Sequence, residues 1–254
     1  MSVDKIQRQR FEKKYIIGEQ TALSIRDFIS CYLEPDEYGV TQDDYSYPVH
    51  SLYFDSPSLK TYKDTVNGDR NRFKLRVRFY ENAPEKPVFF EIKRRYNRVI
   101  TKQRAAVTRE FAAEMAAGYL PSFDNFYYND PMQYNAAERF CELQNLLQAT
   151  PRVHVAYRRE AWKAHGVNSV RVTMDRQVLS EPRQDFDLSP DMTDPVNVFG
   201  DDIVLELKFT DRFPDWFQEL VQVYGLREES AAKYVDGILI HGEQKIASPI
   251  YHHI

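Results

Sequence analysis

The chain has 254 residues, of which 34 are Lys or Arg and 38 are Asp or Glu, so its formal net charge is −4. This balance excludes a global basic field of the kind that recruits nucleic acid, and the length suffices for one large domain with its own core. The two cysteines are too few for a disulfide framework, and neither a signal peptide nor an apolar run long enough to cross a membrane is present. We therefore expect a single domain over residues 1–254 of a soluble, cytoplasmic protein.

The first half of the chain reads as strands that alternate with short helices. Strands are expected where apolar and polar residues alternate, at 8–17, 49–55, 71–80, 87–95 and 99–109. Helices are expected at 19–33 and at 57–66, the second with Ser56 as its N-cap and Pro57 in its first turn. The pair Ala105-Ala106 weakens the alternation of its strand, which leaves the register there open.

The second half begins with helical segments and returns to strands. We expect a short helix at 111–118, an aromatic loop at 121–129 and a longer helix from Asp130-Pro131 to Leu147. Strands follow at 152–162 and 169–178, joined by a hairpin turn at 165–168, and the last strand covers 203–210. Residues 181–200 read as a surface loop. Two further helices are expected, one from Pro214 to Gly225 and one capped by Ser230 that carries Lys233.

One chemical pattern recurs on the polar faces of these strands. In the segment 72–80, apolar side chains occupy one face, and Lys74, Arg76 and Arg78 occupy the other. Four more strands alternate in the same way, and most carry a carboxylate two places from a basic residue. The polar faces together carry these basic residues: Lys14, Lys74, Arg76, Arg78, Lys93, Lys102, Arg104, Arg171 and Lys208. The acidic residues on the same faces are fewer: Glu12, Glu91, Asp175 and Glu206.

Two architectures accommodate these faces. In a sandwich the apolar faces pack together and the charges are solvated. In a barrel with helices outside, the charged faces point inward, where unpaired cations are very costly. A polyanion would balance them, because phosphate oxygens match Arg forks and Lys charges, and Glu206 with Glu12 or Asp175 could hold a divalent metal that bridges phosphates. Recurrence in five strands favours the barrel.

The order of several motifs resembles a known family. The segments are Glu12-Lys-Lys-Tyr15, Ser51-Leu-Tyr-Phe-Asp-Ser56, Lys74-Leu-Arg-Val-Arg-Phe-Tyr80, Glu91-Ile-Lys93 and Ser230-Ala-Ala-Lys-Tyr234. They resemble the catalytic domain of the vacuolar transporter chaperone (VTC), one of the CYTH-like triphosphate tunnel metalloenzymes. The resemblance implies an α+β fold, an antiparallel β-barrel tunnel with helices packed outside. It also implies that the chain binds ATP, inorganic triphosphate or polyphosphate with Mn²⁺ or Mg²⁺. In the polymerase members, the γ-phosphate of ATP moves onto a polyphosphate chain.

The resemblance also implies roles for individual residues. The residues implied to be catalytic are Lys14, Arg76, Arg78, Lys93, Arg159 and Arg171. Those implied to bind substrate are Lys74, Lys102, Arg104, Lys208 and Lys233, and those implied to bind metal are Glu206 and Glu12. Alternation alone equally allows Arg158 in place of Arg159.

One departure from the broader group concerns its Glu-x-Glu-x-Lys signature. It appears here as Arg10-Phe-Glu12-Lys-Lys14, so that one carboxylate is lost. This loss shifts the balance away from hydrolysis of short triphosphates. Three functions stay open: a polyphosphate polymerase, a triphosphate hydrolase and a non-catalytic polyphosphate-binding module. A membrane partner also stays open.

Overall fold

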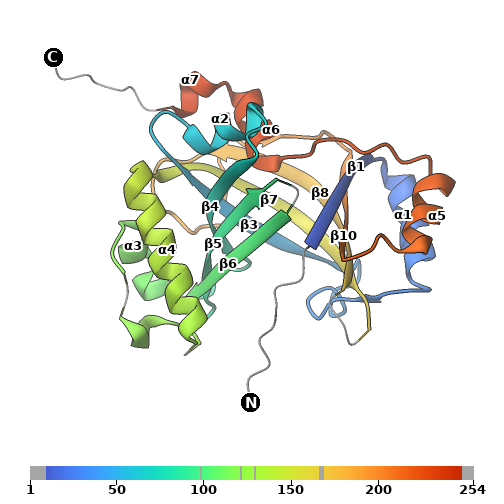
Figure 1. Cartoon of the computed structure of the whole chain (residues 1–254), viewed down its shortest axis with the longest axis horizontal. Coiled ribbons are helices and arrows are strands. Elements are labelled where there is room, and N and C mark those ends of the chain that lie inside the picture. Colours follow the sequence, from blue (N-terminus) through green and yellow to red (C-terminus); the bar gives the residue numbers. More distant parts are fainter. Residues whose placement is uncertain (1–9, 98, 121, 129, 166–168, 248–254) are drawn as a thin grey trace.

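Ten strands form one antiparallel sheet in the computed structural model, which describes residues 10–247 except 98, 121, 129 and 166–168 (Figure 1). The strand order is β2-β7-β3-β4-β5-β6-β1-β10-β8-β9. The strands are β1 (Arg10–Ile17), β2 (Glu34–Pro35), β3 (Ser46–Asp55), β4 (Asn71–Phe79), β5 (Val88–Tyr96), β6 (Val99–Val107), β7 (Thr150–Lys163), β8 (Val170–Pro182), β9 (Val196–Asn197) and β10 (Ile203–Thr210). The helices are α1 (Glu19–Ile29), α2 (Lys60–Val66), α3 (Arg109–Ala116), α4 (Pro131–Leu147), α5 (Asp215–Val223), α6 (Lys233–His241) and α7 (Glu243–Ile246), with a 3₁₀ turn at Phe123–Asn125.

The sheet curls round on itself. Strand β7 pairs with β3 on one side and with β8 on the other, so the succession of paired strands from β7 to β8 returns to its start. Between β6 and β1, the described residues contribute only one pair, Arg10 with Ile100. The expected α+β fold with a curled antiparallel sheet is therefore confirmed, and the sandwich alternative is wrong.

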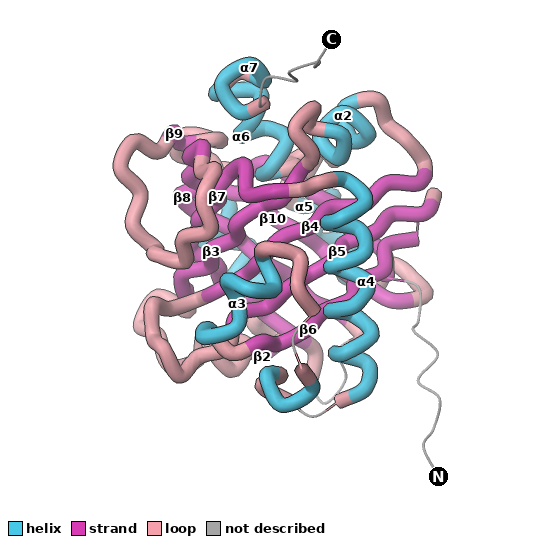
Figure 2. Tube along the Cα trace, turned by 90° about the vertical axis from the view of Figure 1, so that its left-hand side faces the viewer, coloured by secondary structure: helices cyan, strands magenta, loops and turns pink. Residues whose placement is uncertain are grey.

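Helices cover the outer face of the curled sheet on two sides. Helix α4 packs its buried Phe140 against Phe90 of β5, and Figure 2 shows α3 and α4 in front of β4, β5 and β6. Helices α1 and α5 cover β1, β8 and β10, where Ile25 and Leu220 are fully buried with Leu207. Burying each such side chain contributes about 1.5–3 kcal/mol. Because these outward faces are apolar and covered, the charged faces of the same strands point inward.

A third group of helices lies over one end of the curled sheet. Asp55, which is fully buried at the end of β3, accepts hydrogen bonds from Thr61 of α2 and from the hydroxyl of Tyr234 of α6, the latter at 2.7 Å. Tyr234 also stacks on Tyr53 with ring centroids 4.6 Å apart. The first turn of α6, with Lys233, is therefore held against the inner face of the sheet. None of the helices that the structure describes has the length and apolarity that a membrane crossing requires.

Two helices start later than the sequence suggested. Helix α2 begins at Lys60 instead of residue 57, because Leu59 has left-handed backbone angles (φ 58°, ψ 49°). The hydroxyl of Ser56 still accepts a hydrogen bond from the Lys60 N–H, at 2.9 Å. Helix α6 begins at Lys233, and the expected cap at Ser230 is wrong: no side chain caps α6, whose N-cap residue is Ala232.

Most other boundaries shift by a few residues. Helix α1 ends at Ile29, before residue 33, and β3 begins at Ser46, before residue 49. Strands β7 and β8 are both longer than expected, and the loop at 181–200 contains the last residues of β8 and the short strand β9. In β6, Ala106 pairs with Phe89, which settles the register that the sequence left open. Part of the expected hairpin turn, residues 166–168, lies outside the described residues, as do residues 8 and 9 of the first expected strand.

Candidate functional site

The curled sheet encloses a cavity of about 1490 Å³, which we call the tunnel cavity. Fourteen Lys and Arg residues line it, against five Glu residues. The lining includes every residue to which the family resemblance gave a role: Glu12, Lys14, Lys74, Arg76, Arg78, Lys93, Lys102, Arg104, Arg159, Arg171, Glu206, Lys208 and Lys233. Asp175, the other metal ligand that the sequence allowed, is not part of the lining. The structure therefore brings these thirteen residues together, while their individual roles stay predictions.

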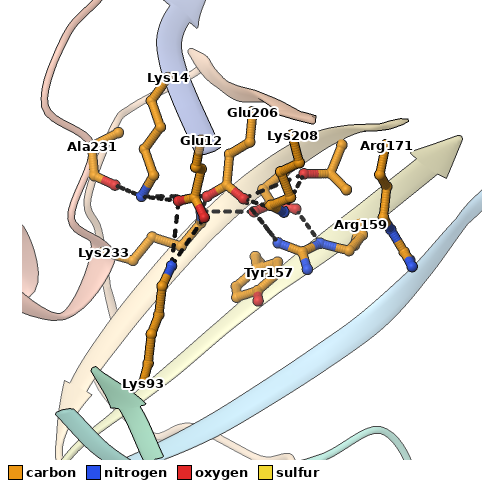
Figure 3. Close-up of polar contacts among 12 residues, drawn as sticks. Glu12, Lys14, Lys93, Tyr157, Arg159, Arg171, Glu206, Lys208, Ala231 and Lys233 are labelled. Carbon is orange, nitrogen blue, oxygen red and sulfur yellow. Dashed lines mark hydrogen bonds and ion pairs between the residues drawn. The ribbon is translucent and has the colours of Figure 1, made fainter. Parts of the chain in front are cut away.

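Glu206 of β10 is the most heavily contacted carboxylate of the tunnel cavity (Figure 3). The ammonium of Lys208, two residues further along β10, lies 2.6 Å from its Oε2. Lys14 and Lys233 each lie 3.4 Å from its Oε1, and Arg159 lies 3.9 Å from Oε2. Burial opposes ionisation of Glu206, but these cations outweigh burial and hold its pKa well below the usual range. Glu206 is therefore ionised at neutral pH.

Glu12 of β1 lies beside this group. Its carboxylate is 3.1 Å from the ammonium of Lys93 and 3.4 Å from that of Lys14. Burial and the nearby charge of Glu206 oppose its ionisation, but the charges of Lys93, Lys14 and Lys208 together outweigh them and lower its pKa. Lys14 also donates to the carbonyl of Ala231, at 2.7 Å. The two carboxylates therefore flank one ammonium group.

The donor set around Lys14 fits a hard divalent cation in part. Glu12 and Glu206 offer ionised carboxylate oxygens, the ligands that Mg²⁺ and Mn²⁺ prefer. No group of three or more His, Cys, Asp or Glu that could hold a metal occurs among the residues that the structure describes. Both oxygens of Asp175 are already bonded, so it is a poor further ligand. A metal here would need phosphate or water oxygens to complete its coordination, as Mg²⁺ does in phosphotransferases.

Asp175 of β8 instead neutralises two cations. Its two oxygens accept from Nε and Nη2 of Arg159, both at 2.7 Å, and the ammonium of Lys233 lies 2.7 Å from Oδ2. The neighbouring Arg158 points away, to Asp44 and Ser46, and its side chain is 42% exposed. The structure therefore selects Arg159 over Arg158 as the arginine of the tunnel cavity.

A second carboxylate centre lies across strands β4, β5 and β6. Glu91 is fully buried and lies 2.6 Å from Arg76, 2.6 Å from Lys102 and 3.4 Å from Arg104. The cross-strand register explains the group, because Glu91 pairs with Arg76 on one side and with Arg104 on the other. Burial opposes ionisation of Glu91, but the charges of Arg76 and Lys102 keep its pKa well below its usual value.

Two tyrosines from the neighbouring strands β3 and β7 hold the arginines of β4. The hydroxyl of Tyr53 accepts from Nη1 of Arg76 at 3.1 Å, and the hydroxyl of Tyr157 accepts from Nη2 of Arg78 at 3.0 Å. Arg78 is 6% exposed, and within the described part of the chain it forms no ion pair with a carboxylate, although the charge of Glu91 acts on it. Neutral hydroxyls orient a guanidinium without cancelling its charge, so Arg78 can still bind an anion.

Arg171 of β8 lies apart from the Glu206 group, as Figure 3 shows. Its Nη2 is 2.6 Å from Oδ2 of Asp36, a fully buried residue that follows β2. Asp36 also accepts from the hydroxyl of Tyr47 at 2.9 Å and from the N–H of Gly39 at 2.9 Å. Arg171 therefore lines the tunnel cavity while it also fixes the loop between β2 and β3.

Burial lowers the pKa of three lysines of the tunnel cavity, Lys74, Lys102 and Lys208. Burial, together with the charges of Lys14 and Lys93, lowers the pKa of Lys74 to about 7. Burial also lowers the pKa of Lys208 to about 8, although Glu206 opposes this shift. A lysine with a depressed pKa gains its full charge when an anion arrives. The cavity is therefore built for a ligand that carries several negative charges.

Sequence reasoning left several contributing residues without a role. Tyr53, Tyr157 and Asp36 orient tunnel arginines, and the carbonyl of Ala231 accepts from Lys14. The two tyrosines had a usable signal, because each shares the inward alternation of its strand with a residue of the cavity. Asp36 and Ala231 lie in irregular segments, where no periodicity predicts the direction of a group.

The chain was compared with known families, curated proteins and solved structures. The family model of the VTC domain matches residues 9–241. Among solved structures, the PH1819 protein from Pyrococcus horikoshii OT3 is similar at a TM-score of 0.44 and 11% identity, over 92% of this chain and 98% of that one. No curated protein matches the sequence significantly. Because the family model covers nearly the whole chain, the protein belongs to the VTC domain family.

Proposed function

We propose that this protein is a polyphosphate polymerase that moves the γ-phosphate of ATP onto a polyphosphate chain inside the tunnel cavity, with a divalent metal. The observation that carries the proposal is the excess of cations in one enclosed site, fourteen Lys and Arg against five Glu in the lining. Unpaired buried cations are costly, and a chain of phosphates supplies matching negative charge along the whole cavity. The VTC domain family, to which the chain belongs, is associated with enzymatic polyphosphate synthesis.

Different groups of residues in the tunnel cavity would have different roles in phosphoryl transfer. Arg76 and Arg78 present guanidinium groups that tyrosine hydroxyls hold in place, which suits them to clamp phosphate oxygens. Lys14, Lys208 and Lys233 surround Glu206 and would neutralise charge on the transferred phosphoryl group. Phosphoryl transfer needs mainly positioning and charge stabilisation, so no covalent intermediate with the protein is required.

A metal would be held by Glu206 and Glu12. Both carboxylates are ionised and flank Lys14, so they offer oxygen ligands on the side of the cavity where cations gather. When bound, Mn²⁺ or Mg²⁺ polarises the phosphoryl oxygens that it contacts. Lys14 and Lys208 would then shift their contacts from the carboxylates to the phosphates, because both ammonium groups lie on the same carboxylate as the metal.

Product analysis tests the proposal. The purified protein is incubated with ATP and either Mg²⁺ or Mn²⁺, and long-chain polyphosphate on a gel and released orthophosphate are followed together. Chains with little orthophosphate would support the polymerase. Orthophosphate without chains would identify a triphosphate hydrolase. Neither product, with polyphosphate binding unchanged by a chelator, would identify a non-catalytic binding module.

A further inference from the structure

The inner face of β4 and β5 arranges charges in successive rows. The register places Arg76 opposite Glu91, then Lys74 opposite Lys93, and then Arg72 opposite Arg95 at the far end. Opposite charges therefore meet in the first row and like charges in the other two. Like charges directly opposite on a sheet destabilise it, so an arrangement of this kind needs a reason outside the sheet itself.

The number of carboxylates that neutralise the basic side chains decreases from the first row to the third. Glu91 lies within 3.4 Å of three cations around the first row, and Glu12 lies 3.1 Å from Lys93 in the second. For Arg72 and Arg95, no ion pair with a carboxylate occurs within the described part of the chain; Arg72 donates only to the backbone carbonyl of Asp69. Both side chains are partly buried and both line the tunnel cavity. Two adjacent guanidinium groups therefore face the cavity, and neither forms an ion pair with a carboxylate of the described residues, although the charge of Asp69 acts on Arg72 from a distance.

The position of this pair relative to the expected triphosphate site decides what it could bind. Arg78 and Arg72 are six residues apart on one strand, which is about 20 Å along β4. A triphosphate contains only two P–O–P linkages and cannot contact both ends of such a row. A longer linear polyphosphate can, because its charges repeat along its whole length. If water alone solvated the two arginines, the affinity of the cavity would not depend on the length of the phosphate chain.

We propose that Arg72 and Arg95 form a separate binding segment for polyphosphate beyond the phosphates held by Arg76 and Arg78, and that this segment makes the cavity prefer long chains over triphosphate. The inference rests on the proposed function in one respect, that the tunnel cavity binds phosphate chains. It adds to that function a second stretch of the polyphosphate, which these two arginines contact, and a selectivity for long polyphosphate over triphosphate. The segment is distinct from the Glu206 group, to which neither arginine contributes a contact.

The test is a comparison of two ligands on one variant. Arg72→Ala with Arg95→Ala is titrated with inorganic triphosphate and with long-chain polyphosphate, at fixed ionic strength and without metal. Loss of charge-assisted contacts should weaken binding of the long chain at least about tenfold and of triphosphate less than about twofold. The matched control removes two arginines that are exposed and absent from the cavity lining, Arg139→Ala with Arg212→Ala, and should change neither affinity.

Each outcome is decisive. If the affinity for both ligands falls equally, the arginines only raise the positive potential of the whole cavity. If the affinity for the long chain does not fall, the arginines do not bind it. Either result overturns the inference. If the double variant unfolds, the single changes Arg72→Gln and Arg95→Gln replace it, each with a smaller loss confined to the long chain. Wild-type protein that binds neither ligand would overturn the inference together with the proposed function. Length-selective loss in a protein that makes no polymer would overturn only the polymerase.

Discussion

The guanidinium of Arg159 and the carboxylate of Asp175 form a two-point ion pair across β7 and β8, with both N–O distances at 2.7 Å. The same carboxylate lies 2.7 Å from the ammonium of Lys233, which enters from α6. Asp175 therefore ties the first turn of a helix to two strands on the inner face. A buried carboxylate in this position stabilises the empty cavity by neutralising cations that an anion would otherwise have to balance.

Replacing Asp175 by Asn should destabilise the ligand-free protein. Arg159 and Lys233 would stay buried with one partner fewer, a loss of about 3 kcal/mol in the free energy of unfolding. Triphosphate should restore part of this loss, because it supplies negative charge to the same cations. Urea unfolding with and without triphosphate measures both effects. The control is Asp215→Asn, whose side chain is 84% exposed beside Arg212, and equal stability of the two variants would contradict the account.

Replacing Arg76 by Ala should weaken triphosphate binding. A charge-assisted hydrogen bond contributes about 1.5–3 kcal/mol, so the dissociation constant should rise by at least about tenfold. The fold should tolerate the change, because Glu91 keeps Lys102 at 2.6 Å. Titration calorimetry measures the affinity. Arg158→Ala removes an arginine of β7 that points to Asp44 instead of the cavity, and this variant should bind triphosphate as the wild type does. An unchanged affinity of Arg76→Ala would remove β4 from the binding site.

Binding of an anion should be coupled to proton uptake by Lys74. Its pKa of about 7 means that it is mostly neutral at pH 8, and the groups facing it are Lys14, Lys93 and Arg72, with Asp236 opposing them. A bound phosphate raises this pKa, so triphosphate affinity should fall as the pH rises above 7. Calorimetry at pH 8 in buffers of different ionisation enthalpy should show that Lys74→Met takes up about one proton fewer than wild type. Identical uptake would contradict the assignment.

The same pKa has a consequence for stability. In the unfolded chain Lys74 would titrate near 10.5, so between pH 7 and that value the unfolded state binds more protons than the folded state. The free energy of unfolding therefore rises with pH across this window, by an amount that Lys74→Met should remove. Denaturant unfolding at several pH values measures the difference between the two proteins. A difference that stays constant from pH 7 to pH 10 would mean that Lys74 is as well solvated when folded as when unfolded.

The direction of the charged faces could be predicted from the sequence because it depends on local geometry alone. Arg76 and Arg78 alternate with buried Val77 and Phe79, and a strand places successive side chains on opposite faces. The same alternation recurs in several strands, and the sequence also predicts helices with apolar faces that can cover the apolar side of the sheet. Together these features predict that the charged side faces inward. The contents of the tunnel cavity followed from this step.

Pairing within the cavity could not be predicted in the same way. Glu206 of β10 contacts Lys14 of β1 and Lys233 of α6. Asp36, in the loop after β2, contacts Arg171 of β8. Such partners are set by how distant segments pack, which no period in the sequence records. The choice between Arg158 and Arg159 depended on register, and the pairing of β7 with β8 shifts just before these residues. The start of α2 was missed because a single backbone conformation, that of Leu59, decides it.

The central claim, that the tunnel cavity transfers phosphate with a metal held by Glu206, is tested most directly by Glu206→Gln. The change keeps the shape of the side chain and removes the charge that a hard cation requires. Turnover of ATP to polyphosphate with Mn²⁺ or Mg²⁺ should be nearly abolished. Binding of triphosphate without metal should be equal or tighter, because one repulsive carboxylate has left the site. Glu142→Gln on the exposed face of α4 serves as the control and should retain full turnover. Full turnover by Glu206→Gln would contradict the claim.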